Sequence, residues 1–192
     1  MDAFGMKFHD QMWAKAQDFG KHIKCVEQFD SFIQTQPGEL QEVLDIVFKW
    51  ANVRINESSN TKLFMSLLDF FGNLLTYLIE NGIELLDFEI CLLLGTLCEK
   101  SGINNKILID KVRKLVRMCY EVYDVKLCYR IIIDMGVKCK NLKSVAEMLD
   151  EVADLIKAHG VDLCTKKDFA LFITTTDCSD KSVRENSLKV FG

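Results

Sequence analysis

Five polar segments recur along this chain at nearly constant spacing: DFGKH (18–22), ESSNT (57–61), KSGINN (100–105), KCKN (138–141) and DKSVR (180–184). Each lies between two apolar stretches. The steps between their equivalent positions (Phe19, Ser59, Gly102, Lys140 and Asp180) are 40, 43, 38 and 40 residues. A period of about forty residues with two helices per repeat is typical of an α-solenoid, whose stacked repeats share one core. The loops along one edge of such a fold are the expected contact surface.

The apolar stretches show the periodicity of amphipathic helices. Ile23, Val26, Phe29 and Ile33, for example, mark one face of a predicted helix over 21–34. The ten predicted helices cover about 5–17, 21–34, 38–55, 61–81, 87–100, 106–122, 125–136, 142–159, 166–175 and 181–191. The sequence therefore predicts an all-α, HEAT-type solenoid of about five antiparallel helix pairs.

We expect these pairs to form a single domain over residues 1–192. The repeats are expected at about 5–34, 38–81, 86–122, 125–159 and 166–191. The chain stops directly after an apolar helix, whereas solenoids need a polar end cap. We therefore expect the natural protein to continue, with the chain truncated before a sixth repeat.

Composition and charge narrow the class of protein. The 192 residues are 49% hydrophobic and 27% charged, which predicts a globular chain. Residues 1–96 carry 7 Lys or Arg and 14 Asp or Glu, a net charge of −7, whereas residues 97–192 carry 17 and 14, a net charge of +3. The total of −4 argues against a dedicated nucleic-acid-binding domain. The more basic second half suits an acidic protein partner.

Cysteines, histidines and apolar runs indicate no metal site and no membrane segment. The eight cysteines contain no C-x-x-C pair and fall mostly in apolar helical stretches, as expected of reduced core residues in a cytosolic protein. His9, His22 and His159 have no partner at metal-ligand spacing, and we expect no cofactor. Residues 1–20 are too polar for a signal peptide, and the apolar runs are expected to be too short to span a membrane.

Catalytic motifs are missing from the sequence. It has no G-x-S-x-G and no glycine-rich phosphate loop. Asp150, Glu151 and Asp154 are interpreted as a solvated helix face rather than as an acid–base pair. We therefore predict a binding protein rather than an enzyme. A concave pocket with converging polar residues would support the enzyme alternative.

The loops carry the candidate binding residues. Phe19, in a polar loop, is either a plug for a neighbouring helix pair or an exposed anchor for a partner. Cations recur in the later loops, at Lys138, Lys140 and Lys143 around Asn141, and at Lys181 and Arg184. An apolar anchor followed by cations along one edge would suit an acidic protein surface.

The same loops and their helices resemble TOG domains, especially the later ones of the mini-spindles/ch-TOG class of microtubule polymerases. The matching segments are DFGKHIKCVE (18–27), VFKWANVR (47–54), KCKNLKSVAEMLDEV (138–152), AHGVDLC (158–164) and DKSVRENSL (180–188). The resemblance extends over about residues 6–190. Each segment alone is a weak match, and their order and spacing together are specific.

The resemblance implies a flat paddle of HEAT helices that binds αβ-tubulin, free or in the microtubule lattice, through the loops of one edge. It implies a non-catalytic domain of a protein that promotes microtubule plus-end growth and spindle organisation. The expected location is the cytoplasm and cytoskeleton, at microtubules, the spindle, and the centrosome or spindle pole. The tubulin-binding residues it implies are Phe19, Lys21, His22, Ser59, Asn60, Thr61, Asn105, Lys106, Lys140, Asn141, Lys143, Lys181 and Arg184.

The sequence also departs from the TOG pattern. Phe19 stands where strong binders of free tubulin carry Trp, and His22 stands where Arg is common, so the charge there depends on pH. Ile109 and Val145 lie where basic residues are frequent in the third and fourth repeats. Fewer cations imply weaker attraction to tubulin. The alternatives are a HEAT scaffold that docks a kinetochore or centrosome adaptor, and a structural spacer. Neither nucleic acid nor a membrane is an expected partner.

Overall fold

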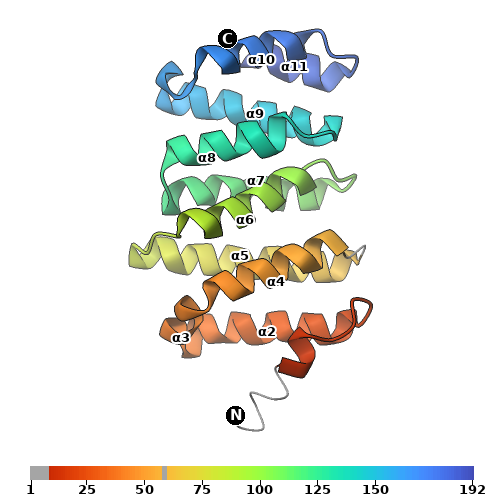
Figure 1. Ribbon diagram of the computed structural model, residues 1–192, viewed down its shortest axis with the longest axis vertical. Coiled ribbons are helices and arrows are strands. Elements are labelled where there is room, and N and C mark those ends of the chain that lie inside the picture. Colours follow the sequence, from red (N-terminus) through yellow and green to blue (C-terminus); the bar gives the residue numbers. More distant parts are fainter. Residues whose placement is uncertain (1–8, 58–59) are drawn as a thin grey trace. The chain divides into compact units, whose positions relative to one another are not determined.

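The computed structural model describes residues 9–57 and 60–192, and the regular structure in these residues is helical throughout (Figure 1). The predicted all-α class is therefore confirmed. The chain divides into two compact units, Met1–Leu93 and Leu94–Gly192. We call them unit 1 and unit 2 and describe each by itself.

Capping residues set the helix ends of unit 1. The side-chain oxygen of Asn60 accepts a hydrogen bond from Leu63 N at 2.9 Å and starts α5, and Gly82 ends that helix with a φ of 63°. Pro37 occupies the first turn of α3, where its missing N–H costs nothing. The helices of this unit are α2 (Phe19–Thr35), α3 (Pro37–Glu42), α4 (Leu44–Glu57), α5 (Thr61–Asn81) and the first half of α6 (Asp87–Lys100).

Aromatic rings fill the core of unit 1, where α2 packs against α5. The ring of Phe29 lies 5.6 Å from that of Trp50 and 5.9 Å from that of Phe70. Phe48 stacks on Phe71 at 5.6 Å. Edge-on and stacked pairs of this kind stabilise a core by about 1 kcal/mol beyond their buried area. The side chains that show the helical periodicity in the sequence are therefore those that hold this unit together.

One helix of unit 1 disagrees with the expectation that the apolar runs are too short to span a membrane. By length and composition alone, α5 is apolar enough to cross a bilayer. Eight of its residues are buried: Leu63, Leu67, Leu68, Phe70, Phe71, Leu74, Leu75 and Leu78. Packing within unit 1 accounts for this apolar character, as in a core helix.

Unit 2 also consists of packed helices. Thr165 and Asp168 form a reciprocal capping box at the start of α10. A Cβ added at Gly136 would lie 2.5 Å from Cγ of Met148, so a glycine lets this turn approach α9 closely. The elements after α6 are α7 (Lys106–Val122), α8 (Val125–Ile131), a π-helical turn η1 (Ile132–Val137), α9 (Leu142–His159), a 3₁₀ turn η2 (Val161–Leu163), α10 (Lys166–Thr176) and α11 (Lys181–Lys189).

An ion-pair network joins α7 to α9 and overturns, for Asp150 and Glu151, the interpretation of the acidic stretch as a solvated face, whereas the side chain of Asp154 is 58% exposed. Glu151 is 1% exposed and lies 2.6 Å from Arg113 and 3.0 Å from Arg117. Arg113 also pairs with Asp150 at 2.6 Å. Burial alone would raise the pKa of Asp150, but hydrogen bonds from Lys189 and Arg113 lower it. The carboxylates therefore hold helices together, because each is paired with a cation.

Three predicted helices differ from the structure. The first is predicted over 5–17, but its described part is helical only to Met12, and the chain is irregular over 13–18. The predicted helix 38–55 breaks at Val43 into α3 and α4. The predicted helix 125–136 turns from α to π at Ile132. At Val43 and Ile132 the apolar residues on both sides of the break stay buried, whereas after Met12 the helix ends and Trp13 is 64% exposed.

Candidate binding loops

The first loop of unit 1 covers residues 13–18 and is fixed by two buried rings. Trp50 Nε1 donates to Met12 O at 2.8 Å, and His22 Nε2 lies 3.4 Å from Ala14 O. His22 is fully buried, with its ring 6.0 Å from that of Trp50 in an edge-on contact. The expectation that His22 presents a charge to a partner therefore disagrees with the structure. Its ring instead contacts the backbone of the loop at Ala14, a role that the sequence does not reveal because Trp50 lies 28 residues further along the chain.

Phe19 and Lys21 follow this loop. Phe19 is the first residue of α2 and is half-buried, so it fits neither a fully buried plug nor a fully exposed anchor. Lys21 is exposed, with its Nζ 3.0 Å from Asp18 Oδ2. The hydrogen bond from Lys21 lowers the pKa of Asp18. This exposed pair contributes little to stability because water screens it.

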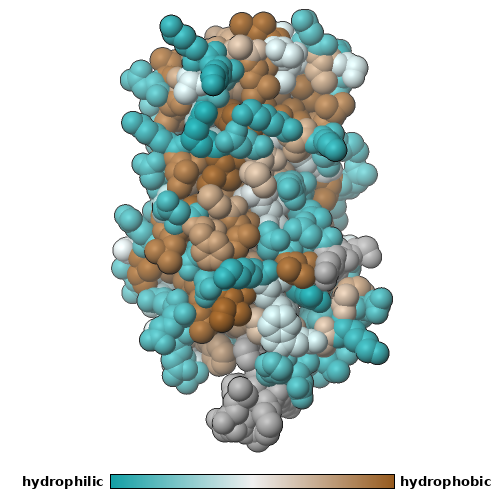
Figure 2. All heavy atoms as spheres, viewed as in Figure 1, coloured by the Kyte–Doolittle hydropathy of each residue, from teal (hydrophilic) through white to brown (hydrophobic). Residues whose placement is uncertain are grey.

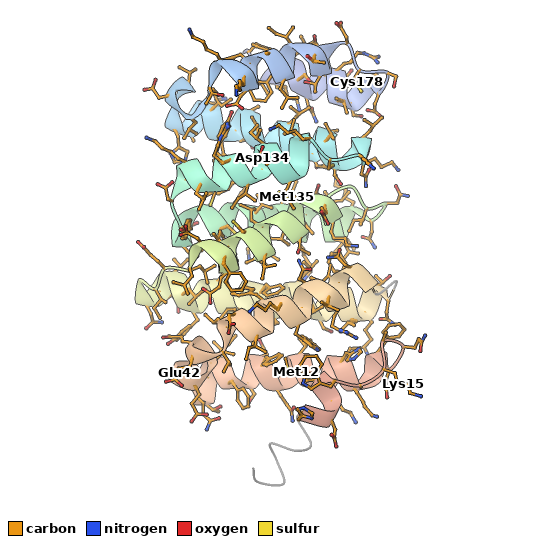
Figure 3. All side chains as sticks on the ribbon, viewed as in Figure 1. Met12, Lys15, Glu42, Asp134, Met135 and Cys178 are labelled. Carbon is orange, nitrogen blue, oxygen red and sulfur yellow. The ribbon has the colours of Figure 1, made fainter. Side chains whose placement is uncertain are left out.

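The sequence pattern misses one residue of the first loop. Trp13 is 64% exposed and lies in the sequence between Met12 and Lys15, which Figure 3 labels, just past the end of the N-terminal helix. The predicted helix over 5–17 includes Trp13 at helical spacing, as expected of a core residue. A tryptophan this exposed in a polar loop is a strong candidate for a partner contact. The only signal in the sequence is the polar run AKAQD that follows it.

In the second loop, Ser59 lies outside the described residues. Asn60 caps α5, so its side-chain oxygen is occupied within the chain. Thr61 is exposed at the first position of that helix. The first and second loops of unit 1 precede α2 and α5, two helices that pack together and begin at the same end (Figure 1). They therefore lie on one edge of this unit.

In unit 2, the third and fourth loops (101–105 and 138–141) are joined by Ser144. Its hydroxyl donates to Glu99 O at 3.0 Å and accepts from Gly102 N at 3.0 Å. Lys143 donates to the side-chain oxygen of Asn104. A Cβ at Gly102 would lie 2.5 Å from Ser144 N, so this contact requires glycine. Two loops that are about forty residues apart in the sequence are thereby fixed side by side.

Predicted site residues in these loops have two different roles. Asn105 and Asn141 are helix caps, since their side-chain oxygens accept hydrogen bonds from Leu108 N at 3.3 Å and Lys143 N at 3.1 Å. The side chains of Lys106 and Lys140 are exposed, and neither side chain has a hydrogen bond or ion pair within the described part of the chain. These two cations of the predicted site are therefore available to a partner.

The fifth loop, 178–180, is stabilised by Arg184. The guanidinium donates from Nη1 to Cys178 O and Ser179 O, both at 2.8 Å, and Cys178 lies where the chain leaves α10 (Figure 3). Arg184 is therefore partly used within the chain. Lys181 is 78% exposed and only 3.5 Å from Glu185. It remains accessible, since exposed pairs of this kind are weak.

The third loop, the start of α9 and the fifth loop line a surface hollow of unit 2. Asn104, Lys106, Lys143 and Asp180 contribute to its lining. The helices α7, α9 and α11, which the three loops of unit 2 precede, begin at the same end of the unit (Figure 1). No group of three or more His, Cys, Asp or Glu able to hold a metal ion occurs among the described residues. At this edge unit 2 exposes Lys106, Lys140 and Lys181, in or beside loops that hydrogen bonds hold in place.

Comparison with known proteins identifies the class of this fold. No family model matches the chain. A solved structure from work on TOG–tubulin binding specificity in microtubule dynamics and mitotic spindle formation aligns with a TM-score of 0.89 and 23% identity, covering 95% of this chain and 73% of that one. The fold is therefore that of a TOG domain, as the resemblance predicts.

Similar sequences narrow the class further. The chain is 27% identical to Protein MOR1 of Oryza sativa subsp. japonica over 146 residues, 76% of its length. It is 25% identical to Protein mini spindles of Drosophila melanogaster over 181 residues, 94% of its length. The chain spans only 7% and 8% of these relatives. The predicted resemblance to the TOG domains of the mini-spindles class is confirmed.

Proposed function

We propose that this chain is a non-catalytic tubulin-binding module that contacts αβ-tubulin, free or in the lattice, through its loops. One observation carries the proposal: Lys106, Lys140 and Lys181 are exposed in or directly after the three loops of unit 2. The helices that follow these loops begin at the same end of the unit (Figure 1). Loops that are already ordered lose little conformational entropy on binding. An acidic partner such as tubulin, as the resemblance implies, would be attracted to such a row of cations.

Unit 1 would supply the apolar contacts. Trp13 is the first residue of the first loop, and Phe19 follows its last residue. His22 and Trp50 fix the backbone of this loop. Aromatic residues in ordered positions are typical of binding hot spots. In this proposal Phe19 and Trp13 supply short-range contacts, and the lysines of unit 2 supply attraction that depends on salt. Asn60, Asn105 and Asn141 act mainly as caps that hold the loops in place.

The non-catalytic part of the proposal is supported by the hollow between the loops of unit 2. Lys143 in its lining is bound to Asn104, and Asp180 caps α11 through Val183 N at 3.1 Å. Groups already engaged in this way are poor candidates for proton transfer. Within a longer protein of this class, several such domains would hold tubulin at a growing plus end through their effective concentration. The expected location is accordingly the microtubule cytoskeleton, including the spindle and its poles.

Binding to purified αβ-tubulin and to taxane-stabilised microtubules tests the proposal. We expect binding that weakens as salt rises and that falls about tenfold in Phe19→Ala, as expected for loss of a hot-spot aromatic residue. Thr76→Ala, an exposed position in the middle of α5 and outside the predicted tubulin-binding residues, serves as the matched control and should bind within about twofold of the wild type. An absence of binding to both forms at low salt would contradict the proposal and favour a scaffold for an adaptor or a structural spacer.

A further inference from the structure

Unit 1 exposes a row of apolar side chains away from the loops. Val43, Ile46 and Val53 are 38%, 46% and 40% exposed. Ile46 and Val53, seven residues apart, lie on one side of α4, and Val43 immediately precedes this helix. Brown, hydrophobic spheres gather over α4 and the start of α6 on the face drawn in Figure 2. We call these three residues the α4 stripe.

The stripe continues onto the start of α6 and the residues before it. Leu86 and Phe88 are 66% and 39% exposed. Lys49, which lies between Ile46 and Val53 in the sequence, has its Nζ 4.8 Å from the centre of the Phe88 ring and 3.0 Å from Asp45 Oδ2. The stem of Lys49 therefore bridges α4 and α6. Several apolar side chains grouped in this way mark an interaction surface more often than the same residues scattered singly.

Acidic residues surround this apolar surface. The segments 39–54 and 84–89 contain six carboxylates, of which that of Glu89 is buried, together with one lysine and one arginine. Glu39, Glu42, Glu84 and Asp87 are exposed, and Glu42 is labelled at the end of α3 (Figure 3). The single lysine is already paired with Asp45. Residues 1–93 as a whole carry 7 Lys or Arg against 14 Asp or Glu. The surface is thus apolar in the middle and negative at its rim.

We propose that the α4 stripe, together with Leu86 and Phe88, binds a lysine- and arginine-rich amphipathic helix of a partner protein. The seven residue steps from Ile46 to Val53 extend about 10 Å along α4, which matches about two turns of a partner helix. The apolar face of that helix would cover Ile46, Val53 and Phe88, as in other helix-in-groove contacts. Its basic residues would meet the acidic rim.

The charge of the rim argues against two other occupants. A second copy of this chain in a twofold contact would place the same acidic residues opposite one another. A membrane surface with anionic lipids would be repelled by the same carboxylates. The α4 stripe also lies apart in sequence from the proposed tubulin-binding residues, so the two surfaces are tested with different variants.

A synthetic eighteen-residue peptide tests the proposal by fluorescence anisotropy with the full 192-residue chain. The peptide has leucine at helical spacing and lysine or arginine elsewhere. Two matched peptides serve as probes of specificity: one with the same composition in scrambled order, and one with glutamate in place of every cation. We expect the scrambled peptide to bind about tenfold more weakly and the acidic peptide to show no binding at the same concentrations.

Variants locate the site. Ile46→Ser combined with Val53→Ser should weaken the basic peptide about tenfold. Glu39→Lys combined with Glu42→Lys should weaken it about fivefold and reduce its salt dependence. Ile173→Ser changes a residue of unit 2 that is 60% exposed, and it should bind like the wild type. All substituted side chains are exposed, so circular dichroism and urea unfolding should show unchanged folding.

Three results would overturn this proposal. The first is equal peptide affinity in the wild type and in the Ile46→Ser, Val53→Ser variant. The second is equal affinity for the ordered and the scrambled peptide. The third is a dimer in sedimentation velocity that the same double variant abolishes, because this would assign the surface to self-association.

Discussion

Substitution of Gly102 by alanine tests whether Ser144 holds the third and fourth loops of unit 2 together. The added Cβ would lie 2.5 Å from Ser144 N and 2.6 Å from Ser144 Oγ. Contact with the nitrogen cannot be relieved by a side-chain rotation, because that atom belongs to the backbone at the start of α9. The third and fourth loops must therefore separate in Gly102→Ala.

The magnitude follows from the contacts that are lost. Separation breaks the hydrogen bonds of Ser144 Oγ with Gly102 N and Glu99 O, each 3.0 Å long. Each such bond contributes about 1 kcal/mol to stability. Residual overpacking adds about 1–2 kcal/mol. We expect the free energy of unfolding to fall by about 3 kcal/mol.

Urea unfolding followed by circular dichroism measures this change, and amide hydrogen exchange should show faster exchange at Gly102. Gly38→Ala is the matched control, because a Cβ there meets nothing within 4 Å and the residue lies in α3. The control should be neutral or stabilising by about 0.5–1 kcal/mol. A Gly102→Ala protein within about 0.5 kcal/mol of the wild type would refute the bracing of these loops.

Three further predictions concern acid stability, the ion-pair network and the exposed tryptophan. Burial tends to raise the pKa of Asp168, but hydrogen bonds from Thr165 and Arg130 lower it overall, so its contribution to stability is present at neutral pH and is lost as pH falls below about 4. Asp168→Asn should therefore flatten the acid limb of a plot of stability against pH, and an unchanged limb would contradict this assignment. Glu151→Gln removes the charge that pairs with Arg113 and should lower the free energy of unfolding by about 2 kcal/mol or more, whereas a neutral result would show that solvent already screens the network. Trp13→Ala should leave urea unfolding within about 0.5 kcal/mol of the wild type yet weaken tubulin binding about tenfold, and equal affinity would remove Trp13 from the site.

Much of the fold could be predicted from the sequence because the period of the apolar residues is strong. The predicted helices 61–81, 87–100, 106–122 and 142–159 coincide with α5, α6, α7 and α9. Their limits are marked by capping residues such as Asn60 and Asn141. The break at Val43 and the π-helical turn after Ile131 leave no such mark, because both keep the same residues facing the core. Whether the two units act as a single domain remains a prediction.

The candidate site was less predictable, because similar residues have different roles. Lys106, Lys140 and Lys181 are accessible, as the loop pattern predicts. Arg184 has the same charge, but its guanidinium binds carbonyl groups of its own loop. The burial of His22 depends on the position of Trp50, which lies 28 residues further along the chain. Periodicity predicts the side of a helix on which a residue lies, but it does not reveal which neighbouring groups that residue contacts or binds.

The most direct test of the central claim is the affinity of a double charge reversal for αβ-tubulin. In Lys106→Glu combined with Lys140→Glu, each change replaces an attraction by a repulsion, and each close contact with an exposed charge is worth about 1 kcal/mol or less. We predict that the dissociation constant rises at least about tenfold at low salt, and that the difference shrinks at high salt. Lys166→Glu combined with Lys167→Glu, at the start of α10, changes the net charge equally and should bind within about twofold of the wild type. Equal loss of affinity in both double variants would show that net charge, rather than the loop edge, governs binding and would contradict the account.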